Sequence, residues 1–484
     1  MNKKFEDVIA EQGRLIYRNE SDSMFPIIQP RDLLVIEAVK EPLKIGDVPL
    51  YKRDSGQYVL HRIVNIKNGK YTMKGDNRSI VEKGITDRHI IGVLTGIVRN
   101  GKTYSVESVP EHTARIAGDL IYLVSCAVNE ETPDKARIAA MDLQEVYRLS
   151  QEHMLTAAVA FALEKAIPLP HAFDQAKKKA IRKLSLFEIE RSAVLSEFEK
   201  AGIWYLPLKG IVLGKYYPKT AMREMSDNDI LCDPNRIDDI RPIMERRGYS
   251  YERFEEYNED VYKRPPTMVF EIHRTLFVEK NSVVLSDYYS DIEDRLVKTS
   301  GCGYKLSDED FYIYLLSHMY KHYSNRGTGL RSLADIYVFL DKAADTLDRE
   351  YIDAELEKLE LSDFERKVSS LSRKVFTNTP LTEKEEKTLD HFIFSSVYGD
   401  PETAETNKYL RAMDHDVSDK SKKKYFRSRV FISGEKLKQN YPFVNKHRVL
   451  YPALVVYRPI KGLIMRPKSI FGEYRKVKKL KKED

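Results

Sequence analysis

The sequence predicts a multidomain protein in which a small, mostly β domain precedes an α+β core with large helical extensions. The chain has 484 residues, which is too long for one ordinary hydrophobic core. Residues 1–108 contain short runs rich in β-branched side chains, and from Glu111 onward apolar residues recur at helical spacing. Around residues 206–300 short apolar strands return between the helical stretches.

We place the domain boundaries where these patterns change. The expected parts are a β domain at 1–108, a helical connector at 109–205, an α+β core at 206–300 and a helical region with a basic tail at 301–484. The connector is expected to pack onto the core, so we count both as one module. Its two long predicted helices span residues 142–166 and 180–203, separated by Pro168 and Pro170.

The composition suits a soluble protein, with 42% hydrophobic and 32% charged residues. No stretch approaches the roughly 20 apolar residues of a membrane span, and the N-terminus lacks the apolar core of a signal peptide. Three cysteines stand far apart, without the spacing of a metal site, which favours a reducing, cytoplasmic setting. The net charge of +6 lies largely in the last residues, so we infer no specific nucleic-acid partner.

The first domain is expected to be built from short strands joined by tight turns. The Asn68-Gly69 pair between two of the strands is typical of a two-residue hairpin turn. The predicted strands lie at residues 33–39, 49–53, 58–66, 71–75 and 90–98.

Three polar features of this domain need an explanation. Ser23 lies in a loop before the first of these strands, His61 is embedded in an apolar strand, and Glu82 follows a Gly-Asp-Asn-Arg loop. A serine, a histidine and an acid can act as a nucleophile, its general base and the group that orients the base. The alternative is that Ser23 is an ordinary turn residue and His61 a structural histidine.

A series of motifs in a fixed order favours the first interpretation. They are SDSMFP at 21–26, KIGDV at 44–48, HRI at 61–63, KGDN at 74–77 and IIG at 90–92. Together they resemble the signal-peptidase fold of serine peptidases, in the branch that uses histidine as the base. The resemblance implies that Ser23 is the nucleophile, that His61 is the base, and that Ser21 assists the oxyanion hole beside the Ser23 amide.

The resemblance has two departures. The position of the family's catalytic acid holds Glu82 instead of aspartate, and Asp87 is the second candidate for this role. The membrane anchor of the signal-processing members is missing. The domain is therefore expected either to cut a cytoplasmic peptide or protein, or to serve as a binding module.

The stretch at residues 206–234 carries the second set of candidate residues. A short strand leads into Lys209 and Gly210, where a glycine turn and a helix N-terminus favour a phosphate group. Asp227 and Asp229 stand two apart at the start of a predicted strand, so their carboxylates face one side. Glu271 lies on another predicted strand, at residues 267–274, and can complete a cluster of three carboxylates.

Such a cluster can hold Mg²⁺, because magnesium prefers carboxylate oxygens. One or two ions would bind a triphosphate and activate an incoming hydroxyl group. The alternative is an ordinary solvated strand edge or a helix cap.

The motifs PLKGIVLGKYY, MREMSDNDILCDP and FEIHRTLF resemble the uncharacterised nucleotidyltransferase family of the polymerase-β superfamily, over about residues 115–470. The resemblance implies a two-metal Mg²⁺ site with a nucleoside triphosphate (NTP) as substrate and an unknown acceptor. It assigns Asp227, Asp229 and Glu271 as metal ligands, with Asp229 also catalytic. It assigns phosphate contacts to Lys209, Gly210 and Ser226, and places Arg223 and His273 at the edge of the site. The turn reads Lys-Gly-Ile where the superfamily usually has serine in second place.

Further helices are expected at residues 308–327, 330–340, 364–376 and 383–398, and the final basic stretch at 472–484 as a helix. His318 and His322, one turn apart, are expected either near the nucleotide or at the surface, and His153 and His171 to be structural or exposed. Arg331 and Asp335 are expected to pair with each other or to face a cleft.

The expected function is Mg²⁺-dependent nucleotidyl transfer to an unknown acceptor by a module fused to a peptidase-like domain. The alternative is that one or both modules are inactive and bind a nucleotide or a peptide.

Overall fold

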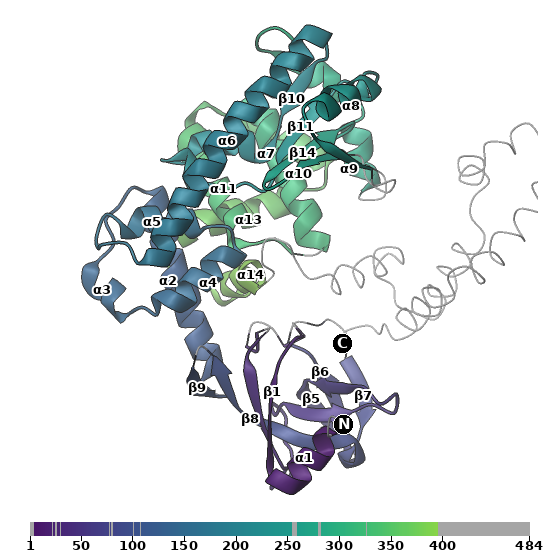
Figure 1. Ribbon diagram of the computed structural model, residues 1–484, viewed down its shortest axis with the longest axis vertical. Helices are drawn as coiled ribbons and strands as arrows, with labels where there is room; N and C mark the ends of the chain where they lie inside the picture. Colours follow the sequence, from purple (N-terminus) through teal and green to yellow (C-terminus); the bar gives the residue numbers. More distant parts are fainter. Residues whose placement is uncertain are drawn as a thin grey trace, which may run out of the picture. The chain divides into compact units, whose positions relative to one another are not determined.

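The computed structural model describes residues 4–394, apart from 22, 25–26, 30, 77, 79–80, 100, 107, 254–258, 279–281 and 326. The basic loop at 418–429 and the basic tail expected at 472–484 lie outside the described residues. The described part of the chain divides into a first unit, up to residue 110, and a second unit, from residue 111 onward (Figure 1).

The first unit contains two antiparallel sheets. The larger sheet has the strand order β1-β2-β8-β3-β4, with β9 also paired to β8, and the smaller sheet has the order β5-β6-β7. Helix α1 (Phe5–Gln12) precedes the strands. The strands are β1 (Arg14–Arg18), β2 (Leu33–Glu37), β3 (Pro49–Lys52), β4 (Tyr58–Leu60), β5 (Arg62–Lys67), β6 (Lys70–Lys74), β7 (Val81–Ile85), β8 (Ile90–Arg99) and β9 (Lys102–Ser105).

All the predicted strand regions of this unit contain strands, and the predicted hairpin turn is confirmed. Asn68 and Gly69 both have positive φ, 51° and 65°, and join β5 to β6. His61 is not embedded in a strand, as the apolar run suggested. It is the single residue between β4 and β5, where the chain leaves the larger sheet for the smaller one.

A buried ion pair anchors the loop that carries Ser23. Asp32, between that loop and β2, binds Arg99 on β8 through both of its carboxylate oxygens, at 2.9 and 2.7 Å. The two side chains are 1% and 3% exposed. Arg99 also donates to the Ile27 carbonyl, and Asp32 accepts the Gln29 N–H. Both charges are thus hydrogen-bonded on several sides, which a buried ion pair requires to be stable.

The second unit is a mixed sheet surrounded by helices. The strand order is β10-β11-β14-β13-β12. Strands β11 and β14 run parallel to each other, and the other neighbouring pairs of this sheet are antiparallel. The strands are β10 (Tyr205–Pro207), β11 (Asn228–Cys232), β12 (Ser250–Arg253), β13 (Glu259–Arg264) and β14 (Met268–His273), and a small separate pair is formed by β15 (Val297–Lys298) and β16 (Tyr304–Lys305).

Helices make up most of this unit, and the helical regions predicted from the sequence are helical within the described residues. Helix α2 crosses the boundary between the units. The helices are α2 (Val109–Val128), α3 (Lys135–Ala140), α4 (Leu143–Glu152), α5 (Thr156–Leu163), α6 (His171–Ala201), α7 (Lys209–Leu213), α8 (Ile237–Arg246), α9 (Val283–Tyr288), α10 (Asp308–Asn325), α11 (Leu330–Ala343), α12 (Arg349–Lys358), α13 (Ser362–Phe376) and α14 (Glu383–Phe394).

One helix prediction was wrong in its continuity. The stretch at 142–166 is two helices, α4 and α5, because the chain turns at His153 and at Met154, whose φ is 52°. His153 is fully buried, and its Nδ1 accepts the N–H of Leu330 at the start of α11. This contact gives the turn a partner far along the chain. The end of α6 at Gly202, with φ of 64°, agrees with the prediction.

The two faces of the mixed sheet have different surroundings. On one face, Ile230 and Phe270 pack with α6 and α8 in a hydrophobic core. Because side chains alternate along a strand, Asp229 and Glu271 point to the other face. Leu231, on that same face, belongs to the larger core that includes α10 and α11. The carboxylates therefore lie on the face of the sheet that the larger core covers.

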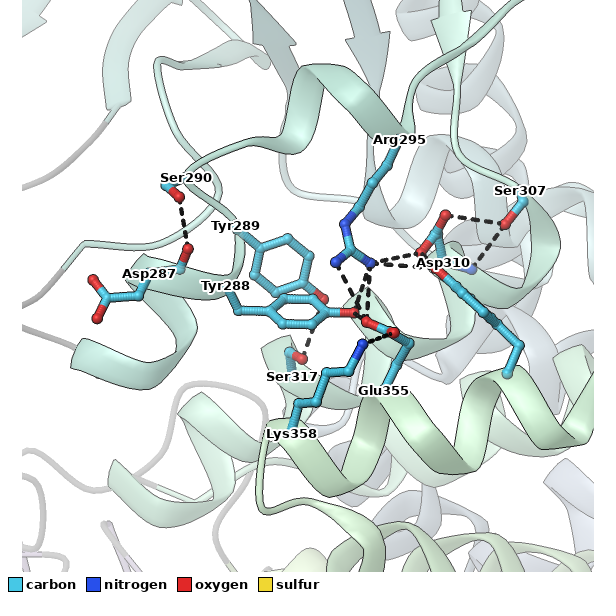
Figure 2. A network of polar contacts seen from close by, with 11 residues as sticks. Asp287, Tyr288, Tyr289, Ser290, Arg295, Ser307, Asp310, Ser317, Glu355 and Lys358 are labelled. Carbon is cyan, nitrogen blue, oxygen red and sulfur yellow. Dashed lines mark hydrogen bonds and ion pairs between the residues drawn. The ribbon is translucent and has the colours of Figure 1, made fainter.

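A polar network ties three helical segments of this unit together. Arg295, after α9, donates to Asp310 on α10 at 3.2 Å and to Glu355 on α12 at 3.3 Å (Figure 2). Its guanidinium lies 4.2 Å from the centre of the Tyr288 ring, and the Tyr288 hydroxyl donates to Glu355. The network links α9, α10 and α12.

Among the described residues, none of the helices is long and apolar enough to cross a membrane. The three cysteines, Cys126, Cys232 and Cys302, are free thiols.

Candidate active site

Two neighbouring strands bring the predicted carboxylates together. Strands β11 and β14 run parallel, with Asp229 opposite Glu271 and Leu231 opposite His273. Asp229 and His273 are buried, and the His273 Nε2 lies 3.0 Å from the Asp229 Oδ1. The pairing of β11 with β14 is therefore what converts two distant sequence motifs into one site.

The arrangement fits a divalent metal ion. Ligand atoms of Asp229, Glu271 and His273 all lie within 4.8 Å of one another. Two carboxylates and an imidazole are suitable donors for such an ion. The Nδ1 of His273 is buried without a hydrogen-bond partner among the described residues, and the nearest carboxylate, on Glu259, lies 3.6 Å from it.

Lys209 lies against the same cluster. Its Nζ is 2.6 Å from the Asp229 Oδ1, and its side chain is 21% exposed. Lys209 is the first residue of α7 and has a φ of 45°, so the turn before the helix directs it toward β11. An ammonium group has three N–H donors, so Lys209 retains donors that can contact a substrate.

Asp227 stands just before β11. Its Oδ2 accepts a hydrogen bond from the Ser226 hydroxyl at 2.9 Å. This bond uses the Ser226 proton within the protein, and the two residues form one polar unit at the start of the strand. Asp227 also interacts electrostatically with Asp229, and both act on Glu271.

The charges of the cluster are unequally compensated. Burial and the neighbouring Asp229 raise the pKa of Asp227. Burial, Asp229 and Asp227 together raise the pKa of Glu271 to about 9. Burial also opposes ionisation of Asp229, but Lys209 and His273 outweigh it and hold the pKa of Asp229 below its ordinary value. Without a cation, these shifts favour the protonated form of Glu271 at ordinary pH, and a bound cation would instead favour its ionised form.

The glycine of the turn is in contact with the protein itself. A Cβ on Gly210 would lie 2.7 Å from Nη1 of Arg223 and 2.9 Å from Cγ of Met225. The space expected to admit a phosphate at Gly210 is thus filled, at its α-carbon, by Arg223. Arg223 is buried and forms a two-point ion pair with Asp335 on α11, at 3.1 and 3.0 Å.

The expected pair between Arg331 and Asp335 does not form. Asp335 instead binds Arg223 and accepts the Tyr217 hydroxyl at 2.8 Å. Arg331 donates to the Glu224 carbonyl at 2.9 Å. Spacing of one helical turn made the local pair plausible, but the nearby Arg223 competes for the carboxylate from another part of the chain.

Helix α10 forms the opposite wall of the cluster. His318 lies 3.2 Å from His322, measured between their Nε2 atoms. Burial, Lys209 and His322 lower the pKa of His318 well below its ordinary value. Burial and Lys209 also lower the pKa of Lys321, while the site's carboxylates act in the other direction. Of the two positions considered for these histidines, the structure supports the one near the site for His318.

Sequence reasoning missed Glu259. It lies on β13 opposite His273 on β14, and adds a further carboxylate to this face of the sheet. Its signal was weak because residues 254–258 and the surrounding stretch are rich in acidic residues without an alternating pattern. His171, by contrast, is exposed, one of the two outcomes expected for it.

The candidate residues of the first unit also approach one another. The Ser23 carbonyl lies 2.6 Å, and the His61 Nε2 3.0 Å, from the position that a Cβ on Gly75 would take. The Gly75 loop is held to β5 by Arg62, which binds both oxygens of Asp76 at 2.8 and 2.7 Å. The Ser23 N–H donates to the Ser21 hydroxyl oxygen at 3.1 Å, so Ser21 lies beside that amide as expected.

Glu82 approaches His61 through an intermediate side chain. The Tyr51 hydroxyl donates to Glu82 at 2.8 Å and lies 3.3 Å from the His61 Nδ1. Glu82 is also bound by Arg53 at 2.6 Å. Asp87, the second candidate acid, accepts the Tyr71 hydroxyl at 2.6 Å. Tyr51 was missed because a tyrosine in a strand carries no sequence signal beyond β-propensity.

The environment of His61 keeps it neutral. Burial and the positive charge of Arg53 lower the pKa of His61 to about 4. A neutral imidazole at ordinary pH is the form that accepts a proton from a nucleophile.

Comparison with known proteins finds one family. Residues 139–377 match the model of a family described as "Uncharacterised nucleotidyltransferase". The matched residues contain both strands of the cluster and lie wholly within the second unit. No match supports the signal-peptidase resemblance of the first unit. Searches of curated proteins and of solved structures found no significant match.

Proposed function

We propose that the carboxylate cluster of the second unit transfers a nucleotidyl group from an NTP to an acceptor hydroxyl. Residues 139–377, which contain the cluster, match the model of the uncharacterised nucleotidyltransferase family. The observation that carries the proposal is the pairing of Asp229 with Glu271 on parallel strands, beside Lys209 and His273. Buried carboxylates beside one ammonium group match the needs of a metal-bound triphosphate, whose charge must be balanced on two sides.

Of the expected ligands, Asp229 and Glu271 would hold the metal together with His273, whose ligand atom lies within 4.8 Å of theirs. Asp227 stays a proposed ligand from its place just before β11 and its electrostatic effect on Glu271. A bound divalent ion supplies charge neutralisation and lowers the pKa of an attacking hydroxyl group. Lys209 binds Asp229 and offers further N–H donors to a phosphate oxygen. Arg223 acts on the site as a fixed support, because its buried guanidinium forms a two-point ion pair with Asp335.

The reaction is a displacement at the α-phosphorus of the NTP. The acceptor oxygen forms a bond to that phosphorus, and the bond to the bridging oxygen of the β-phosphate breaks. Pyrophosphate leaves with the bonding electron pair, and the proton of the hydroxyl passes to the carboxylate cluster and then to water.

Substitution of the central carboxylate tests this function. Asp229→Asn keeps the side-chain volume but removes the charge that Lys209 and His273 bind, so we expect Mg²⁺-NTP binding to weaken by about a hundredfold or more, as for loss of a buried charged partner. Isothermal titration calorimetry with each of the four NTPs measures it. Asp238→Asn, an exposed carboxylate on α8, is the matched control. Equal NTP affinity in wild type and Asp229→Asn would rule out this site.

A second candidate function belongs to the first unit and is supported by the group of Ser23, His61, Tyr51 and Glu82. Here the Ser23 hydroxyl would attack a peptide carbonyl, with His61 as the general base. The substrate would be a peptide or protein of the cytoplasm. The Tyr51 hydroxyl lies between the acid and His61, so it would orient the base in place of a direct carboxylate contact.

Labelling of the full chain with a serine-reactive phosphonate decides the second candidate. We expect the probe to modify Ser23 in the wild type, and to modify it more slowly in Ser21→Ala. In Ser23→Ala we expect no modification at this position. Peptide mass spectrometry locates the label. A wild type that takes up no label at Ser23 would leave the first unit as a binding module.

A further inference from the structure

A cavity opens beside the carboxylate cluster, and neither the family match nor the expected metal site accounts for it. Its volume is 420 Å³, within the usual range of small-molecule sites of about 300–1,000 Å³. Helices α4 and α6 and the segment before β11 line it. The polar side chains of its wall include Tyr147, Gln151, Gln175, Lys179, Lys183 and Glu224.

The cavity is connected to the candidate active site by a very short piece of chain. Arg223, Glu224 and Met225 form part of its wall, and Asp227 follows two residues later. An extended chain advances at most about 3.6 Å per residue, so the Cα atoms of Met225 and Asp227 are within about 7 Å of each other. Asp227 also acts electrostatically on the Lys183 amine in the cavity wall, so this end of the cavity lies within electrostatic range of the cluster.

The charge of the cavity is positive. Lys179 and Lys183 stand one turn apart on α6, on the same face of the helix. The Lys183 Nζ donates to the Met225 carbonyl at 2.6 Å. Neither lysine forms an ion pair with any residue that the structure describes.

The acidic side chain of the cavity, Glu224, compensates part of this charge and is itself held in place by the backbone. The Glu224 Oε1 accepts the N–H of Ala157 at 3.0 Å, at the start of α5. Burial lowers the pKa of Lys183, and the neighbouring Lys179 acts in the same direction, while Asp227 and Glu224 oppose the shift. An anion between the two lysines would relieve their mutual repulsion.

The remaining lining groups can orient a polar molecule. Gln151 and Gln175 supply amide groups that both donate and accept hydrogen bonds. Tyr147 packs edge-on against Phe173, with ring centres 5.0 Å apart, and so is fixed in position. The cavity thus combines two cations, neutral hydrogen-bonding groups and a fixed aromatic ring.

We propose that this cavity binds the acceptor of the transfer, and that the acceptor is a small molecule with a phosphate or carboxylate group that the lysine pair holds while a hydroxyl group reaches the Asp227 end. The inference rests on the proposed function, since a transferase needs a second substrate within reach of the carboxylates. Lys179 and Lys183 are then specificity-determining residues. The bond changes are those of the displacement described above.

Pyridoxal 5′-phosphate tests the cavity in the full-length protein, because its aldehyde reacts with a lysine amine and its phosphate supplies the anion. After borohydride reduction and peptide mass spectrometry, we expect Lys183 to be labelled about tenfold more than Lys178, an exposed lysine of the same helix. Lys179→Gln should lower labelling of Lys183 by about tenfold, the equivalent of one charge-assisted hydrogen bond. Pyridoxal without the phosphate should label Lys183 weakly.

Protection experiments identify the ligand class. Glycerol 3-phosphate or glycerate is expected to protect Lys183, and which of the two protects better distinguishes a phosphate from a carboxylate. Glycerol should not protect, and Mg²⁺-ATP should leave the labelling unchanged. Protection by Mg²⁺-ATP would assign the cavity to the nucleotide, and equal labelling of Lys183 and Lys178, or no protection by either anion, would also overturn the proposal.

A separate measurement keeps this test distinct from that of the proposed function. Lys179→Gln should bind Mg²⁺-NTP as the wild type does, and Asp229→Asn should retain selective labelling of Lys183. Selective labelling in a wild-type protein that binds no Mg²⁺-NTP would refute the transferase and its acceptor together, while leaving the cavity as an anion site.

Discussion

Gly210 shows how closely single residues of the candidate active site are packed. A Cβ at this position would overlap Arg223 and Met225, whereas a Cβ on Gly118 of α2 would meet no heavy atom within 4 Å. We therefore expect Gly210→Ala to lower the free energy of unfolding by about 1–3 kcal/mol. Gly118→Ala should raise it by up to about 1 kcal/mol, since alanine favours the helix.

Urea unfolding of both variants measures these effects. A stability of Gly210→Ala equal to the wild type would show that Arg223 moves aside freely, against the two-point contact with Asp335.

The titration of His61 predicts a pH dependence of stability. Its pKa in the folded protein is about 4, against an ordinary value of 6.5. Between these values the unfolded chain binds a proton that the folded chain excludes, so stability present above pH 6.5 is lost as the pH falls toward 4. Denaturant unfolding of the first unit at a series of pH values should show this slope.

His61→Gln should remove that component of the slope, and His171→Gln, at an exposed helix position, should keep it. The same slope in His61→Gln and in the wild type would contradict the assignment.

At the residue level, the sequence was informative where a strict local period applies. The two-residue period of a strand predicted which face of its strand Asp229 and Glu271 each point to. In the structure the two residues lie opposite each other on β11 and β14. Contacts between distant segments were not predictable, because spacing along the chain does not show which segments meet. Arg223 with Asp335, and Tyr51 between Glu82 and His61, are of this kind.

Among the elements, the network of Figure 2 makes Arg295 the link between α9, α10 and α12. Arg295→Ala would leave Asp310 and Glu355 without their common cation, although Glu355 keeps Lys358, so we expect a loss of about 1–3 kcal/mol in unfolding free energy. Arg366→Ala removes a surface ion pair with Asp363, both exposed, and should cost less than about 1 kcal/mol. Thermal unfolding compares the two, and similar losses would contradict the role of the network.

Helix and strand positions followed from periodicity, but helix breaks did not. The apolar pattern at 142–166 continues through His153 and Met154 without a glycine or a proline, so a single helix was the natural prediction. The break depends on the buried contact of His153 with α11, which is a tertiary interaction. Similarly, α8 contains Pro242 and was not predicted, because proline usually marks a helix end.

For the whole molecule, the division into two units predicts two unfolding transitions. Mg²⁺-ATP at about 100 times its dissociation constant should stabilise the second unit by about 2.7 kcal/mol, because the ligand binds only the folded form. The first unit has no part in the cluster and should not respond. Differential scanning calorimetry of the full chain, with Asp229→Asn as the variant that loses the shift, tests this. A shift of both transitions would contradict the independence of the units.

The boundary between the units was expected near residue 108 from the change of sequence period, and compact packing divides the chain at residues 110 and 111. The finer division of the second unit into connector, core and helical region stays a prediction. Helix α6, from the expected connector, shares a hydrophobic core with the sheet.

The setting of Arg223 has a consequence for the timing of events at the candidate active site. Its guanidinium is held by Asp335, touches Gly210 and borders the cavity beside the cluster. A buried guanidinium held by a two-point ion pair has little freedom left to lose when a ligand arrives. The wall shared by the two substrate positions is therefore ordered when the protein folds. Binding a substrate then does not carry the entropic cost of ordering this part of the site.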